Sequence, residues 1–210
     1  MSRDLMKTGT TTLAIKCKDG LVLAADKRAT AGNFIANKKV KKVFSVTDRI
    51  VLTMAGTVSD AQLMSRLFRA ELQLKTYKTK RIPNVKESAN LLAGLVYSNI
   101  RKMSLIPGVS HFLMGGEDMD GFHVYDLYPD GSLTEVEDFV SSGSGSVMAY
   151  RVLETLFKSD ITVEDGVKLA LKSVNAALQR DSASGNGIDV VTITKEGIKR
   201  VIERELESVL

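Results

Sequence analysis

The sequence predicts an α+β fold in which helices cover mainly antiparallel sheets. Strands and helices follow each other in groups (strands, two helices, strands, two helices, strands) and do not alternate one by one. The strand-like segments are joined by short hairpin turns, which favour antiparallel pairing. No linker, repeat or low-complexity tract divides the 210 residues, so one domain is the simplest interpretation.

The first strands are predicted at residues 12–17 and 21–25, joined by a turn at Lys18-Asp19-Gly20. The second of these segments, Leu-Val-Leu-Ala-Ala, is wholly apolar, which indicates a strand buried on both faces. A further pair is predicted at 42–46 and 50–55.

Two helices are expected next. Ala61, Met64, Phe68 and Leu72 recur at spacings of three and four residues, which predicts one buried helix face. A second helix is expected over about 86–102.

The second half repeats this order. Strands are predicted at 111–115, 122–127 and, as one segment, 135–140. Helices follow at about 147–157 and from Thr162, where Asp165 completes a capping-box pattern. Residues 188–194 and 198–202 form a closing hairpin.

Composition excludes several classes of function. The 29 basic and 25 acidic residues are interspersed, and no basic arm of the kind that binds nucleic acid is present. No run reaches the roughly 18 apolar residues of a membrane helix, and the first nine residues lack the apolar core of a secretory signal. The lone Cys17 fits a reducing compartment. We therefore expect a cytoplasmic protein without nucleic-acid or membrane partners.

The usual nucleophile and metal sets are poorly supported. His111 and His123 lie in strand-like segments far from any Gly-x-Ser-x-Gly elbow, and Cys17 is expected to be a buried strand residue. Two histidines and one cysteine also make a poor metal-ligand set, so neither a metal nor a cofactor is predicted.

Gly9-Thr10 offers a different chemistry. A threonine at the start of a mature chain carries its own base, because the α-amino group has a pKa of roughly 7.7–8.0. Thr10 gains that amine only if residues 1–9 are removed, and a preceding glycine leaves the peptide bond open to the next hydroxyl. Taken alone, the dipeptide is more simply interpreted as the start of a strand.

Six segments together carry a much more specific signal. Nearly the whole chain resembles the proteasome β subunits, most closely the archaeal kind, among the N-terminal nucleophile hydrolases. The matching segments are Gly9–Thr12, Ala25–Thr30, Lys41–Phe44, Ala55–Ala61, Gly143–Ser146 and Gln179–Gly185. This resemblance implies a four-layer αββα sandwich, with 1–9 as a propeptide removed by autocleavage between Gly9 and Thr10, and 10–210 as the mature domain.

The resemblance also implies a role for each matching residue. Thr10 would be the nucleophile, Lys42 the cation beside it and Asp26 the carboxylate that holds this lysine charged. The Gly56 N–H would face the developing oxyanion.

The supporting polar set around the threonine amine would be Ser144, Asp181 and Ser184. Read singly, Asp26 could be a turn residue, Lys42 a solvated charge and the Gly143–Ser146 segment a flexible loop. Their joint occurrence favours the catalytic interpretation.

Substrate recognition is also implied. The Thr30 backbone would pair with the substrate in β fashion. Ala29, Val40, Met54 and Val58 would line the pocket for the residue before the cut, and their apolar character predicts cleavage after large apolar residues.

Assembly follows from the same resemblance. Heptameric β rings, with other β subunits, would stack between α-subunit rings as α7β7β7α7, fed with unfolded polypeptide by an ATP-dependent unfoldase. The alternative is a catalytically silent, unprocessed ring subunit.

Overall fold

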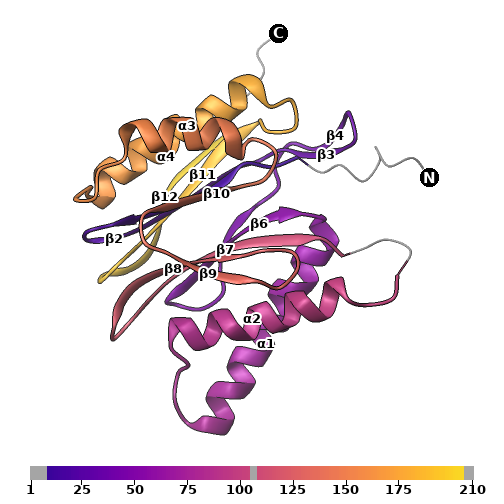
Figure 1. The fold of residues 1–210 in the computed structure, drawn as a ribbon, viewed down its shortest axis with the longest axis vertical. Coiled ribbons are helices and arrows are strands. Elements are labelled where there is room, and N and C mark those ends of the chain that lie inside the picture. Colours follow the sequence, from indigo (N-terminus) through magenta and orange to yellow (C-terminus); the bar gives the residue numbers. More distant parts are fainter. Residues whose placement is uncertain (1–8, 105–107, 206–210) are drawn as a thin grey trace.

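The computed structural model describes residues 9–104 and 108–205, which form a four-layer αββα sandwich (Figure 1). Two five-stranded sheets stack face to face, and a pair of helices covers each outer face. The predicted fold class is confirmed.

The first sheet contains the strand β1 that directly follows Thr10. Its strands, in spatial order, are β10 (Phe139–Ser142), β1 (Thr12–Cys17), β2 (Gly20–Asp26), β11 (Gly187–Thr194) and β12 (Gly197–Glu205). All neighbours are antiparallel. The β1–β2 hairpin pairs Thr12 with Ala25, so Thr10 and Asp26 emerge at the same end of adjacent strands.

The second sheet contains β5 (Val43–Ser45), β6 (Ile50–Gly56), β7 (Ser110–Asp118), β8 (Gly121–Leu127) and β9 (Leu133–Val136). The prediction of one strand over 135–140 was wrong: β9 pairs with β8 in this sheet, whereas β10 pairs with β1 in the other. The exposed Glu137 and Asp138 carry the chain from one sheet to the other. A small hairpin of β3 (Ala29–Ala31) and β4 (Phe34–Asn37) was not predicted.

Four helices cover the sheets: α1 (Val58–Thr79), α2 (Val85–Ile100), α3 (Ser146–Leu156) and α4 (Val163–Arg180). The buried face predicted for α1 is confirmed. The Thr162 hydroxyl caps α4 by accepting the Asp165 N–H, but the Asp165 carboxylate accepts from that hydroxyl at 3.4 Å and not from the Thr162 N–H, so the predicted capping box is only half formed. Among the described helices, none has the length and apolar character needed to span a bilayer.

Three apolar clusters hold the four layers together. One lies between α1, α2 and the second sheet and is centred on Phe68 and Phe112. Another lies between α3, α4 and the first sheet, around Leu153 and Leu169. The third fills the space between the sheets and includes Leu113. Burial of these faces drives the stacking.

Candidate active site

Thr10 lies at the edge of the inter-sheet layer, with its side chain almost fully buried. Its hydroxyl donates to the carbonyl oxygen of Gly9 at 2.6 Å. The Lys42 ammonium approaches the same oxygen at 3.4 Å. Two polar groups from distant parts of the chain therefore converge on the carbonyl of the Gly9–Thr10 peptide bond.

Asp26 and Lys42 form a buried ion pair at 2.7 Å. The Asp26 carboxylate also accepts the backbone N–H groups of Thr11, Arg28 and Gly185 at 2.9–3.0 Å. Desolvation lowers the pKa of Lys42 from its ordinary value, and the Asp26 carboxylate opposes that shift. Asp26 thus favours the charged form of Lys42, as expected from the sequence, but burial has the larger effect on the lysine pKa.

A second set of polar side chains surrounds the Thr10 nitrogen. Ser144 accepts the Thr10 N–H at 3.2 Å and donates to the Asp181 carboxylate at 2.6 Å. Ser184 donates to the same carboxylate oxygen at 2.7 Å. The fold therefore brings the three predicted supporting residues together at Thr10.

Close packing explains two of the glycines here. A Cβ at Gly9 would lie 1.7 Å from the Ala183 Cβ, and one at Gly143 would lie 2.1 Å from the Thr10 carbonyl oxygen. Gly143 also has φ +92°, a conformation that favours glycine.

Gly56 is the last residue of β6 and has φ +108°. Its strand is tied to Lys42, because the Met54 N–H donates to the Lys42 carbonyl at 2.9 Å. Thr30 contacts the Gly9–Thr10 segment through its side chain: the Thr30 hydroxyl accepts the Gly9 N–H at 3.0 Å. The predicted β pairing of the Thr30 backbone with a substrate stays a prediction.

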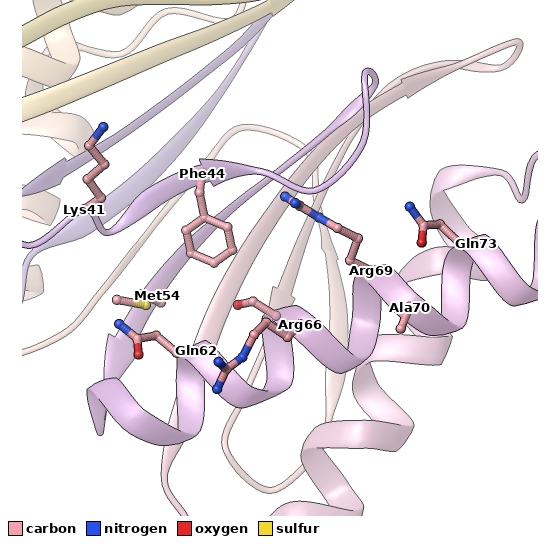
Figure 2. A pocket seen from close by; sticks show the side chains of 9 residues that line it. Lys41, Phe44, Met54, Gln62, Arg66, Arg69, Ala70 and Gln73 are labelled. Atoms are coloured by element: carbon pink, nitrogen blue, oxygen red, sulfur yellow. The ribbon is translucent and has the colours of Figure 1, made fainter.

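The residues predicted to line a substrate pocket are partly grouped. Met54, Val40 and Val58 pack in the cluster beneath α1 and α2, whereas Ala29 lies on β3, outside that cluster. Met54 also lines a cavity of about 540 Å³ between β5, β6 and α1 (Figure 2).

The cavity adds residues that the sequence had not indicated. Phe44 from β5 faces the cavity together with Met54, and Gln62 lies on the first turns of α1. Lys41, Arg66 and Arg69 supply positive charge around it.

Sequence reasoning also missed Thr11 and Arg28, although both lie in the matching segments. The Thr11 hydroxyl bonds that of Ser184 at 2.7 Å. The Arg28 guanidinium donates to Asn186 and to the Ser182 carbonyl, both at 2.7 Å. Arg28 thereby secures the loop that supplies Ser184 and Gly185 to the site.

The described residues contain no cluster of three or more His, Cys, Asp or Glu side chains suited to a metal ion. The predicted propeptide is described only at Gly9, since residues 1–8 lie outside the described part of the chain.

Comparison with known proteins identifies the family. A family model described as "Proteasome subunit" matches residues 6–193. "Proteasome subunit beta" of Ferroglobus placidus is 44% identical over 210 residues, covering 100% of this chain and 98% of that protein. The same-named proteins of Archaeoglobus fulgidus (41%, covering 100% and 97%) and Methanocaldococcus jannaschii (40%, covering 99% and 91%) are also similar.

The sandwich fold and the family match define the class: the chain belongs to the proteasome subunit family. Within this family it is a β subunit of the archaeal type.

Proposed function

We propose that this chain is an active threonine endopeptidase subunit and that Thr10 is its nucleophile. The observation that carries the proposal is the convergence of the Thr10 hydroxyl and the Lys42 ammonium on the Gly9 carbonyl oxygen. A nucleophile and a cation at one scissile carbonyl are what acyl transfer requires.

The first reaction is removal of the leader. The Thr10 oxygen adds to the Gly9 carbonyl carbon, and the hydroxyl proton passes to a neighbouring base. Lys42, whose pKa burial lowers, is suited to exchange that proton and to support the oxyanion when protonated. The C–N bond then breaks as the Thr10 nitrogen gains a proton, leaving an ester. Water hydrolyses this ester, which releases residues 1–9 with a new carboxyl group and frees the amine and hydroxyl of Thr10.

The second reaction repeats this chemistry on substrates. The freed amine acts as the base for the Thr10 hydroxyl. Ser144, which already accepts the Thr10 N–H and is itself held by Asp181, orients that amine. The hydroxyl attacks the substrate carbonyl, the amine product leaves, and water hydrolyses the acyl ester. The Gly56 N–H serves as the oxyanion donor in this scheme.

The cavity beside Met54 supports a preference for large apolar residues before the cut. Its volume lies within the range of about 300–1,000 Å³ typical of ligand pockets, and Phe44 and Met54 provide apolar surface. Lys41, Arg66 and Arg69 around the cavity would instead attract an acidic side chain. Peptides with an acidic residue before the cut are therefore the most informative comparison.

Assembly completes the proposal. Seven-membered β rings between α rings would enclose the Thr10 sites, so that only unfolded chains delivered by an ATP-dependent unfoldase reach them. The buried, unpaired Cys17 suits a cytoplasmic location.

Hydrolysis of fluorogenic peptides by particles assembled with an α subunit tests the proposal. Thr10→Ala should abolish hydrolysis. Thr12→Val is the matched control, because the buried Thr12 hydroxyl has no hydrogen-bond partner in the described structure and valine has the same shape. Equal hydrolysis by the Thr10→Ala and wild-type particles would refute the nucleophile. A wild-type particle without hydrolysis would favour the silent ring subunit. Faster cutting after Glu or Arg than after Leu, Phe or Tyr would refute only the apolar preference.

A further inference from the structure

A second chain of hydrogen bonds lies near Thr10 and uses none of the residues assigned above. The Ser142 hydroxyl lies 2.7 Å from His111 Nδ1, and His111 Nε2 lies 2.5 Å from Asp126 Oδ1. Ser142 belongs to β10 of the first sheet, whereas His111 and Asp126 belong to β7 and β8 of the second. The set therefore joins the two sheets.

The chemistry of these groups suits a continuous chain of bonds. An ionised carboxylate only accepts hydrogen bonds, so His111 Nε2 is the donor to it. A serine hydroxyl can both donate and accept, so it bonds His111 Nδ1 in either protonation state of the imidazole. The Tyr128 ring, whose centroid lies 4.7 Å from that of His111, packs against the imidazole.

Burial argues against a second hydrolytic centre. Ser142 is only 3% exposed and Asp126 only 5%, so a peptide substrate has no access to the Ser142 hydroxyl. The Ser142, His111 and Asp126 side chains must therefore act on neighbouring parts of the fold and not on a substrate.

Ser142 directly precedes the turn that contacts Thr10. A Cβ at Gly143 would lie 2.1 Å from the Thr10 carbonyl oxygen, so the turn has little freedom there. The Gly145 N–H donates to the same oxygen at 3.3 Å, and Ser144 accepts the Thr10 N–H. A displacement of Ser142 would therefore move the groups that hold both ends of Thr10.

His111 also lies beside the strand that ends at Gly56. In the β6–β7 register it pairs with Ala55, the residue before Gly56, and Gly56 pairs with Ser110. The histidine thus stands between the Gly143–Ser144 turn of one sheet and the Gly56 end of a strand in the other.

We propose that His111, oriented by Asp126, is a positioning residue that fixes the Gly143–Ser144 turn relative to Gly56 through its bond to Ser142. The apolar cluster between the sheets supplies contact area, and the directional Ser142–His111 bond adds a geometric constraint at this end, as the Lys42–Asp26 pair does beside it. The inference rests on the proposed function, in which Ser144 orients the Thr10 amine and the Gly56 N–H serves the oxyanion.

The test uses particles assembled with an α subunit and a peptide that the wild type cuts. Ser142→Ala removes the hydroxyl and leaves the His111–Asp126 pair intact, and Ser142→Thr keeps a hydroxyl. Ser173→Ala in α4 is the matched control, since Ser173 is also buried and makes one hydrogen bond, to the Leu169 carbonyl, away from the site.

Ser142→Ala should lower kcat about tenfold, the size expected from a small misplacement of reacting groups, with KM within about twofold of the wild type. Ser142→Thr should recover most of the loss, and Ser173→Ala should retain the wild-type kcat. An unchanged kcat in Ser142→Ala would overturn the inference, as would a loss that Ser142→Thr fails to recover. A wild-type particle without hydrolysis would instead overturn the proposed function and this inference with it.

Discussion

Replacement of Asp26 by asparagine probes the buried centre of the site. The carboxylate is fully buried and accepts four hydrogen bonds. Oδ1 accepts from the Thr11 N–H and from Lys42, and Oδ2 accepts from the N–H groups of Arg28 and Gly185. All four partners are donors, so the site is matched to a carboxylate and not to an amide.

The expected cost follows from this arrangement. An asparagine amide offers one acceptor oxygen and one NH₂ group, so in either orientation the NH₂ faces two donors. Each buried donor left without an acceptor costs about 1–3 kcal/mol, which gives about 2–6 kcal/mol for two. Loss of one partner from a buried ion pair costs about 3–5 kcal/mol. Both routes describe the same defect, and we expect Asp26→Asn to lower the free energy of unfolding by about 4 kcal/mol.

Urea unfolding of the purified chain measures this change. Asp181→Asn is the matched control, because two of the groups that donate to Asp181 are the hydroxyls of Ser144 and Ser184, which can rotate to accept from an amide. It should cost less than about 1.5 kcal/mol. An Asp26→Asn chain within about 1 kcal/mol of the wild type, or an equal cost for both variants, would refute the reasoning.

Three further predictions concern separate features. Gly9→Ala should block leader removal, because the new Cβ would lie 1.7 Å from the Ala183 Cβ, and Ala183→Gly should not rescue it, since the Ala183 Cα and carbonyl oxygen would still lie 2.7 and 2.9 Å away. The mass of the chain in assembled particles measures this, and normal processing of Gly9→Ala would contradict the packing argument. Burial raises the pKa of Cys17 to about 12, so iodoacetamide at pH 8 should label the unfolded chain and spare the folded one; equal labelling would contradict this. The hydrogen bonds from Arg81 lower the pKa of Glu87 from 4.5 to about 2. The stabilisation by this pair is therefore present above pH 4.5 and is lost as the pH falls toward 2. In Arg81→Ala, NMR titration should find the Glu87 pKa shifted back toward 4.5.

Local patterns predicted most of the fold. The three- and four-residue spacing of Ala61, Met64 and Phe68 predicts the buried face of α1 because it depends only on helix geometry. The wholly apolar segment before Asp26 likewise predicted a central strand, β2, whose residues are all buried. The split of 135–140 into two strands could not be predicted, since strand period does not say which sheet a segment joins.

In the candidate site, too, the sequence predicts the local contacts but not those that depend on how the sheets stack. The β1–β2 hairpin alone predicts that Thr10 and Asp26 emerge together, because its register is local. The position of Lys42 was indicated only by resemblance, and its approach to Gly9 depends on the stacking of two sheets. The Ser142–His111 contact spans 31 residues and belongs to no motif, so the histidine appeared in the sequence as an ordinary strand residue.

The intact mass of the chain after assembly with an α subunit tests the central claim most directly. We predict that the wild-type chain loses residues 1–9, so that Thr10 becomes the first residue, and that Thr10→Ala retains them. A wild-type chain of full-length mass in the assembled particle would leave Thr10 without a free amine and would contradict the account.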